Sequence, residues 1–148
     1  MKKNTRVKNN KEKKRDKERK VILTIQASLD GLIAEPHNGM NFLQAGVGES
    51  IQDSIENVWR HVDTILMGRV MYEGLSQFWP FQTGEFADFM NKLPKYVYSK
   101  SLTEVTWGKF DNIEVVSSNI SEHIKNLKEA DSNKSIILVG GAKVVQSF

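Results

Sequence analysis

The sequence predicts an α/β fold built on a mainly parallel sheet. Five short apolar runs alternate with longer amphipathic segments along most of the chain. Strands that alternate with helices are typical of right-handed βαβ crossovers, which align the strands in parallel. The length of 148 residues and the hydrophobic fraction of 39% suit one domain with a single core.

The predicted strands share an apolar, β-branched composition and are bounded by turn residues. They are residues 21–26, 64–67, 95–98, 113–116 and 135–139. The first strand leads into the turn Ser28-Leu29-Asp30-Gly31, and the second stops at Gly68. Runs this short are typical of buried strands rather than helices.

Amphipathic segments between these runs predict the helices. They open at Ser50, near Val70, at Phe86, at Asn119 and after Gly140-Gly141. The second of them is expected to end before Pro80, and Pro94 closes the third. Asn119 and Glu122 have the spacing of a capping box. Residues 35–49 are predicted to form a long loop, a kind of segment that often carries function.

The formal net charge of +3 combines two unlike regions. Residues 1–20 carry eleven basic and three acidic residues, a net charge of +8, whereas residues 21–148 carry ten basic and fifteen acidic residues, a net charge of −5. The tail at 1–20 has one aliphatic residue and no aromatic one, so it is expected to be disordered or transiently helical. Its Lys and Arg residues would suit an arm that binds RNA or DNA, but the lack of stacking side chains favours a solvated extension.

Several classes of protein are excluded by what the sequence lacks. No apolar stretch follows the basic start, as a signal peptide requires, and no run approaches the length of a membrane span. The absence of cysteine excludes a disulfide scaffold and a cysteine-based zinc site. The three histidines lack metal-ligand spacing, and no GxSxG elbow is present. We therefore expect a cytoplasmic protein with no metal and no membrane contact.

Three predicted strand ends carry residues that suit phosphate groups. Gly140-Gly141 joins a strand to a helix, where glycine lets backbone N–H groups approach an anion. Met67-Gly68-Arg69 adds a guanidinium, and Ser99-Lys100-Ser101 adds hydroxyls and an ammonium. The first two have ordinary alternatives, namely a tight turn for the two glycines and a solvated side chain for Arg69. Because carboxyl ends of parallel strands meet at one edge, together they favour a site for a phosphorylated nucleotide.

The order of these motifs resembles the dihydrofolate reductase superfamily. The matching segments are residues 25–34 (IQASLDGLIA), 63–69 (DTILMGR), 95–100 (KYVYSK) and 139–143 (VGGAK). More closely, the chain is similar to bacterial stand-alone relatives of the reductase domain of bifunctional riboflavin-biosynthesis enzymes. The resemblance runs from about Val21 to Phe148.

This resemblance implies a three-layer fold and NADPH as the hydride donor. It implies that the first strand and its loop line the nicotinamide and substrate, through Ala27, Ser28, Asp30 and Ile33. The residues implied to contact the cofactor's phosphates are Gly68, Arg69, Ser99, Lys100, Gly140, Gly141, Ala142 and Lys143. A cis peptide bond between Gly140 and Gly141 is a further expectation.

Some positions depart from the family pattern. Met71 stands where relatives often have a threonine that helps to hold the pyrophosphate. Asn41-Phe42 lacks the acidic residue that often precedes the aromatic one, and Val139 replaces a glutamate typical of riboflavin reductases. No residue matches the carboxylate that serves folate, so Asp30 is the candidate proton donor or substrate contact. The family's chain also continues beyond this point, so we expect the last strands of the domain to be missing.

Three hypotheses follow. The first is an NADPH-dependent reductase of a small heterocyclic or carbonyl substrate; similarity would label it a 5-amino-6-(5-phosphoribosylamino)uracil reductase, an activity against which Val139 argues. The second is a nucleotide-binding but inactive remnant. The third, a nucleic-acid-binding accessory protein, rests on the tail alone. Relatives often form dimers, so a homodimer is a further expectation.

Overall fold

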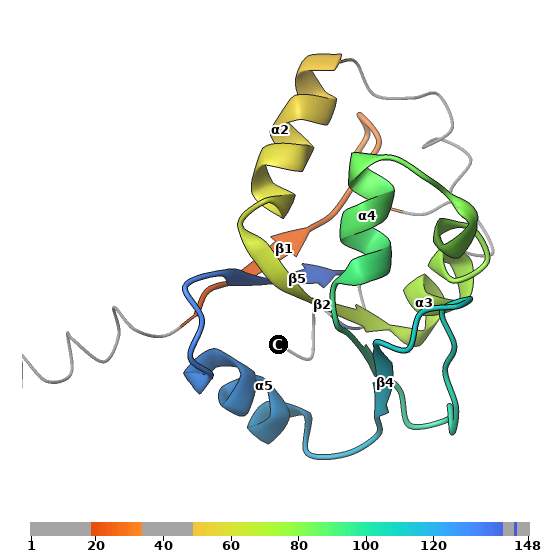
Figure 1. The fold of residues 1–148 in the computed structure, drawn as a ribbon, viewed down its shortest axis with the longest axis vertical. Helices are drawn as coiled ribbons and strands as arrows, with labels where there is room; N and C mark the ends of the chain where they lie inside the picture. The colour runs from red at the N-terminus through yellow and green to blue at the C-terminus, as the bar shows by residue number, and fades with distance from the viewer. Residues whose placement is uncertain (1–18, 34–48, 141–143, 145–148) are drawn as a thin grey trace, which may run out of the picture.

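A five-stranded sheet with helices on both faces forms the body of the molecule (Figure 1). The structure is a computed structural model that describes residues 19–33, 49–140 and 144. The strands are β1 (Val21–Thr24), β2 (Val62–Gly68), β3 (Lys95–Tyr98), β4 (Ile113–Val116) and β5 (Ser135–Val139). The helices are α2 (Glu49–Trp59), α3 (Arg69–Leu75), α4 (Glu85–Lys92) and α5 (Ile120–Glu129), with a 3-10 turn η3 (Trp79–Phe81).

All neighbouring strands run parallel, in the order β1-β5-β2-β3-β4. The last strand in sequence, β5, pairs with β1 on one side and with β2 on the other. It is therefore central, as its continuous apolar run predicts. The predicted mainly parallel sheet is confirmed.

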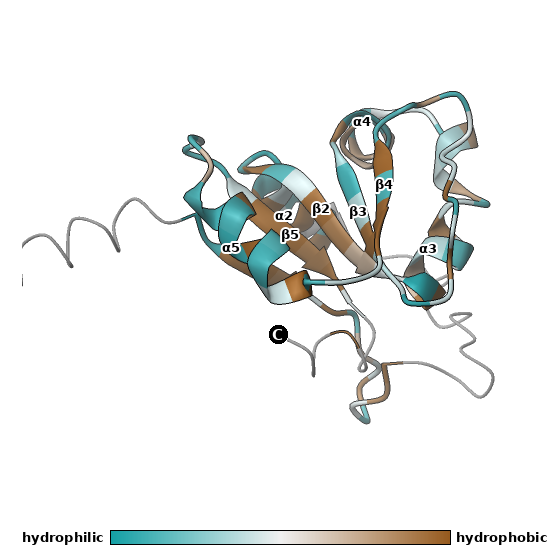
Figure 2. Ribbon diagram, turned by 90° about the horizontal axis from the view of Figure 1, so that it is seen from below, coloured by the Kyte–Doolittle hydropathy of each residue, from teal (hydrophilic) through white to brown (hydrophobic). Residues whose placement is uncertain are grey.

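The sheet separates two hydrophobic cores because side chains alternate along each strand. Helices α2, α3 and α4 lie over one face and α5 lies over the other (Figure 1). Ile65, Met67 and Val97 pack on the first face with Trp59 of α2 and Met90 of α4. The second core consists of Leu66, Tyr98, Ile136 and Leu138, with α5 packed against it. Figure 2 shows the hydrophobic strands beside the hydrophilic outer turns of α5.

The element boundaries agree with the sequence prediction except at a few ends. β3, β4 and β5 span the predicted residues, β1 ends two residues earlier, and β2 begins at Val62, which pairs with β5. α3 ends at Leu75, short of the predicted end before Pro80. Gly74 weakens the helix there, and Pro80 lies in the first turn of the separate η3.

Two other predictions concern α5 and the long loop. α5 begins at Ile120 as predicted, but Asn119 adopts a left-handed backbone (φ 51°) and its side chain makes no capping hydrogen bond within the described structure. The predicted capping box is therefore wrong, because this backbone conformation differs from the extended one that caps require. Most of the predicted loop at 35–49 lies outside the described residues, and Glu49 already belongs to α2.

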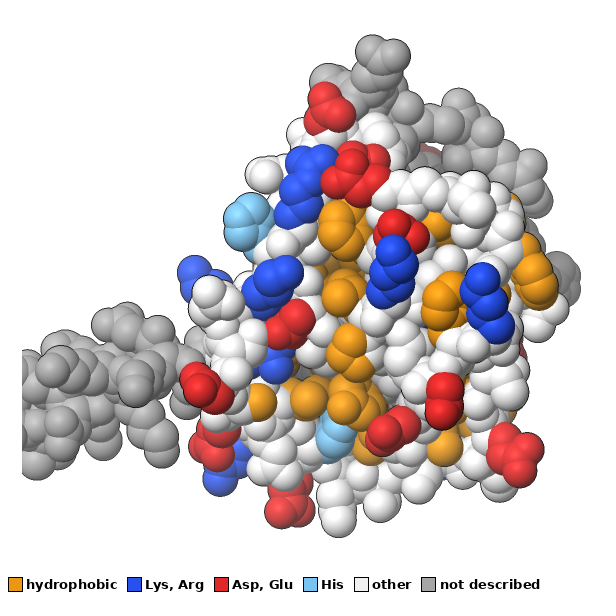
Figure 3. Space-filling model, in the orientation of Figure 1, with side chains coloured by type: hydrophobic (Ala, Val, Ile, Leu, Met, Phe, Trp, Pro, Cys, Tyr) orange, Lys and Arg blue, Asp and Glu red, His pale blue; other side chains and the backbone are white. Residues whose placement is uncertain are grey.

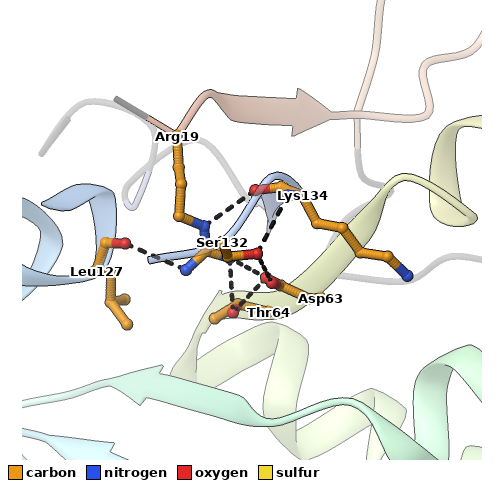
Figure 4. Close-up of polar contacts among 6 residues, drawn as sticks. All are labelled: Arg19, Asp63, Thr64, Leu127, Ser132 and Lys134. Atoms are coloured by element: carbon orange, nitrogen blue, oxygen red, sulfur yellow. Dashed lines mark hydrogen bonds and ion pairs between the residues drawn. The ribbon is translucent and has the colours of Figure 1, made fainter. Parts of the chain in front are cut away.

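Two residues of the predicted basic tail, Arg19 and Lys20, belong to the described structure. The side chain of Arg19 is buried. Its guanidinium contacts Asp63, Thr64, Leu127 and Lys134, as Figure 4 shows. Arg19 is thus tied to residues far away in sequence. The rest of the predicted tail lies outside the described residues.

Two absences hold for the described residues. No helix among them is long and apolar enough to cross a membrane. No group of three or more metal-binding side chains occurs among them either. On the face in Figure 3, Lys and Arg side chains alternate with Asp and Glu, so this face of the described domain presents no basic patch for nucleic acid.

Candidate functional site

The carboxyl ends of the strands lie along one edge of the sheet, here called the carboxyl edge. In the parallel register, Val139 pairs with Thr24 on one side and with Met67 on the other. Gly68 pairs with Tyr98. The segments that follow β1, β5, β2 and β3 therefore leave the sheet side by side. Open parallel sheets bind ligands at this edge.

Gly68 ends β2 where another segment approaches closely. A Cβ atom at Gly68 would collide with Cγ2 of Val144, so only glycine fits without movement of a neighbour. Val144 also packs against the core on the α5 face. Val144, which follows β5 in the sequence, thus lies against the end of β2.

Arg69 is the first residue of α3 and is accessible to solvent. Its side chain is 51% exposed, and Nη1 lies 3.6 Å from Oε1 of Glu73 one turn further along the helix. An exposed ion pair of this kind contributes little energy and leaves most guanidinium N–H groups to water. Arg69 is therefore free to contact an anion at the carboxyl edge.

Ser99 and Lys100 follow β3 on the neighbouring strand. The Ser99 hydroxyl oxygen accepts hydrogen bonds from the backbone N–H groups of Ser101 and Leu102, at 3.2 and 3.1 Å. Its hydroxyl lies 3.3 Å from that of Ser101. Ser99 thus closes a local turn. Lys100 is the next residue of this turn and is exposed.

The loop after β1 is organised by Ser28. The Ser28 backbone N–H donates to the Leu32 carbonyl at 2.8 Å, and the Leu32 N–H donates back to Oγ of Ser28 at 3.0 Å. The Ser28 hydroxyl also lies 2.5 Å from Oδ1 of Asp30, which is exposed. Gly31 has a φ of +83°, a conformation that favours glycine. Asp30 is therefore oriented by Ser28 and open to solvent, while Ala27 is exposed and Ile33 is half-buried.

Part of the predicted site falls outside the described residues. Gly140 follows β5 and is half-buried beside the end of β2. The structure does not describe Gly141, Ala142 or Lys143, nor the predicted cis bond between the two glycines. Asn41-Phe42 also lies outside the described ranges.

The family follows from comparison with known proteins. Residues 19–148, which are most of the 148-residue chain, match the family model of the RibD C-terminal domain. The chain belongs to the RibD C-terminal domain family. The match begins at Arg19, the first residue that the structure describes as part of the domain.

Relatives of this RibD C-terminal domain include one curated protein and two solved structures. The uncharacterized protein YwjB of Bacillus subtilis (strain 168) is 25% identical over 134 residues, which cover 88% of this chain and 69% of YwjB. A putative riboflavin biosynthesis protein from Shewanella sp. PV-4 superposes with a TM-score of 0.64 at 23% identity, covering 87% of this chain and 68% of that one.

The second structure is a bifunctional enzyme from Thermotoga maritima, a diaminohydroxyphosphoribosylaminopyrimidine deaminase and 5-amino-6-(5-phosphoribosylamino)uracil reductase. It superposes with a TM-score of 0.56 at 16% identity, covering 88% of this chain and 41% of that one. At these identities the two structures show the fold alone. The predicted family and fold class are confirmed, and the family relates the chain to reductases of riboflavin biosynthesis.

The departures from the family pattern have structural counterparts in this RibD C-terminal domain. Met71 packs against the core on the α2–α4 face, so an apolar side chain stands where the resemblance implies a hydroxyl. Val139 lies in the sheet between Thr24 and Met67 and packs against the same core. No carboxylate is available at that position for a substrate.

Sequence reasoning missed the hydroxyl groups of two tyrosines. Tyr72 on α3 contacts Thr106, and Oη of Tyr98 lies 3.0 Å from Nδ1 of His123 on α5. Burial lowers the pKa of His123, against the opposite effect of the Glu114 carboxylate, and burial raises the pKa of Tyr98. The contact between Tyr98 and His123 therefore joins β3 to α5. No local pattern predicts either contact, because the partners are 25 or more residues apart.

Proposed function

We propose that this domain is an NADPH-dependent reductase that delivers a hydride to a small heterocyclic or carbonyl substrate. The observation that carries the proposal is the pair of exposed cations Arg69 and Lys100. They follow β2 and β3, two strands that are neighbours in the sheet. A dinucleotide with an additional ribose phosphate carries separate anionic groups that such a pair can bind.

The residues at the carboxyl edge fit the phosphates of this cofactor. Gly68 has no side chain to obstruct the approach between β2 and the segment after β5. Arg69 and Lys100 would contribute charge, and the Ser99 turn would hold Lys100 in place. Gly140, Gly141, Ala142 and Lys143 complete the proposed phosphate contacts.

The loop after β1 would receive the nicotinamide and the substrate. The cofactor supplies the hydride, and the protein's part is to orient it. Reduction of a C=O or C=N bond also needs a proton at oxygen or nitrogen. Asp30, oriented by Ser28 and open to solvent, is the group that we assign to proton delivery or substrate contact. Ala27 and Ile33 would line the same side.

The second candidate is a domain that binds the nucleotide without turnover. Met71 favours it, because this side chain packs into the core and offers no hydroxyl to the pyrophosphate. The absence of a carboxylate at Val139 argues in addition against the uracil substrate of the riboflavin pathway.

Titration of the full chain with NADPH tests the first proposal. The three tryptophans report binding through their fluorescence, and thermal unfolding gives an independent readout. We expect saturable binding, with NADH weaker than NADPH. Absence of both a fluorescence change and a thermal shift at millimolar NADPH would refute the proposal. Binding without oxidation of NADPH on pterin, flavin-precursor and carbonyl panels would select the inactive candidate.

Charge-removing variants locate the site. Arg69→Gln and Lys100→Gln should each weaken NADPH binding about 10-fold, since a hydrogen bond to a charged group contributes about 1.5 kcal/mol or more. Arg60→Gln is the matched control. Arg60 is also exposed, but it follows the end of α2 and pairs with Glu56 and Glu85. Equal effects of all three variants would indicate a general charge effect and no site.

A further inference from the structure

The connection between β3 and β4 must travel the full length of the sheet. It leaves the carboxyl edge at Ser99 and returns to the opposite edge, where Ile113 pairs with Lys95. Residues 99–112, here called the strap, pass beside α3 (Figure 1). The strap begins with Ser99 and Lys100, so whatever holds it also holds part of the proposed phosphate site.

The middle of the strap is anchored to α4 and η3. Trp107 is completely buried, and its Nε1 donates to Oδ1 of Asn91 at 2.8 Å. Asn91 in turn donates to the Trp79 carbonyl at 2.9 Å. Gly108 has a φ of +57° and lies against Pro80 so closely that a Cβ atom would not fit. The backbone around Trp107 is therefore a fixed point.

Tyr72 ties α3 to this fixed point. Its hydroxyl oxygen accepts from the Thr106 N–H at 2.9 Å and lies 3.4 Å from the Thr106 carbonyl, to which the hydroxyl donates. One side chain thus binds both backbone groups of the residue next to Trp107. The ring of Tyr72 also packs against the core beneath α3.

α3 depends on this tie more than a longer helix would. It has seven residues, and all of them are at least partly exposed. Gly74 also lowers its helical propensity. Helices this short have little stability of their own and rely on tertiary contacts. Arg69 lies at the start of α3 and Lys100 at the start of the strap. The hydrogen bonds between Tyr72 and Thr106 therefore connect the two segments that carry these cations.

We propose that Tyr72 is a positioning residue that fixes the spacing between Arg69 and Lys100. The inference rests on the proposed function of these two cations. A fixed spacing favours a ligand with two separate phosphate groups, because the ordering cost is met before the ligand arrives. A ligand with one phosphate contacts one cation, so its affinity does not depend on the hydrogen bonds between Tyr72 and Thr106.

The test compares Tyr72→Phe with Tyr96→Phe in the full chain. Tyr96 is the matched control, since it is a half-buried tyrosine on the opposite face of the sheet, against His123. Tyr72→Phe should weaken NADPH binding about 3- to 10-fold, the range expected for loss of one or two neutral hydrogen bonds. The inhibition constant of inorganic phosphate should stay within 2-fold of its value for the unchanged protein. For Tyr96→Phe, both this constant and the dissociation constant of NADPH should stay within 2-fold.

Amide hydrogen exchange supplies a readout that does not depend on the cofactor. The Thr106 N–H and the α3 amides should exchange faster in Tyr72→Phe than in Tyr96→Phe. Unchanged exchange at Thr106, or NADPH binding within 2-fold of the unchanged protein, would overturn the inference while leaving the proposed function intact. If the unchanged protein binds no NADPH, both proposals fall together.

Discussion

The two ends of the sheet use the same kinds of side chain for opposite purposes. At the amino ends of the strands, Arg19 and Lys95 are buried and surrounded by oxygen atoms. At the carboxyl edge, Arg69 and Lys100 are exposed. The cations at the amino ends are thus held by oxygen atoms of the protein, whereas those at the carboxyl edge lie in solvent.

The Arg19 cluster joins four segments at the amino ends. Its Nε donates to the Lys134 carbonyl at 3.0 Å and its Nη1 to the Leu127 carbonyl at 3.1 Å (Figure 4). Nη2 pairs with the Asp63 carboxylate, whose other oxygen accepts from the Ser132 hydroxyl at 2.5 Å. The partners of the guanidinium therefore come from β2, from α5 and from the turn before β5.

Lys95 is the second buried cation. Its Nζ donates to the carbonyls of Asn91 and Leu93, at 3.2 and 2.6 Å, and to Oδ1 of Asn112 at 3.0 Å. Three oxygens match the three N–H bonds of an ammonium group. Nζ also lies 5.1 Å from the ring centre of Trp107. Burial nevertheless lowers the pKa of Lys95 to about 7.

The largest expected effect comes from breaking the Arg19 cluster. Arg19→Met should reduce the free energy of unfolding by about 3 kcal/mol, because it leaves the Asp63 carboxylate without its counter-charge. Urea unfolding at neutral pH measures the loss. Arg60→Met is the control, and its unfolding midpoint should stay close to that of the unchanged protein, since Arg60 is exposed. A similar midpoint for Arg19→Met would contradict a stabilising role at the amino ends.

The next effect is a pH dependence that belongs to Lys95. Because its folded pKa of about 7 lies below the ordinary value of 10.5, the unfolded chain binds more protons between these two values. Stability should therefore rise with pH from about 7 toward 9.5, by at most about 1.4 kcal/mol per pH unit, and level off below 7. Lys95→Met should remove this slope. Urea unfolding of both proteins across this pH range measures the slope. An equal change of unfolding free energy with pH in the two proteins would contradict the prediction.

A smaller effect is expected at the end of β2. Gly68→Ala should destabilise the domain by about 1–2 kcal/mol, because the added methyl group collides with Val144. Val144→Ala in the same chain should restore part of the loss, which thermal unfolding of the single and double variants measures. No rescue would mean that Val144 does not lie against Gly68.

The smallest effect on stability is expected at the exposed cations. Arg69→Gln together with Lys100→Gln should change the free energy of unfolding by less than about 0.5 kcal/mol, because both residues are exposed. The comparison between the two ends predicts that this pair matters for NADPH binding and not for folding. Chemical denaturation and NADPH titration of the same sample separate the two, and a large loss of stability would break the contrast.

Local sequence patterns predicted the strands because short apolar β-branched runs bounded by turn residues are typical of strands. β3, β4 and β5 span the predicted residues for this reason. The helix predicted to run toward Pro80 stopped at Leu75, since a period of 3.6 cannot show where packing ends a helix. The order of strands, with β5 between β1 and β2, could not be read from the chain because it depends on pairing across more than 100 residues.

The sequence by itself determined the α/β class and the series of glycine- and cation-bearing strand ends. Tertiary structure decided which cations are buried and hydrogen-bonded inside the fold. Counting charge assigned Arg19 to a solvated tail, yet its acceptors at Asp63, Leu127 and Lys134 lie 44 to 115 residues away. A charged side chain is stable in the interior only when several distant acceptors converge on it. That convergence exists for Arg19 and Lys95, whereas in the described structure it is absent around Arg69 and Lys100, which are exposed.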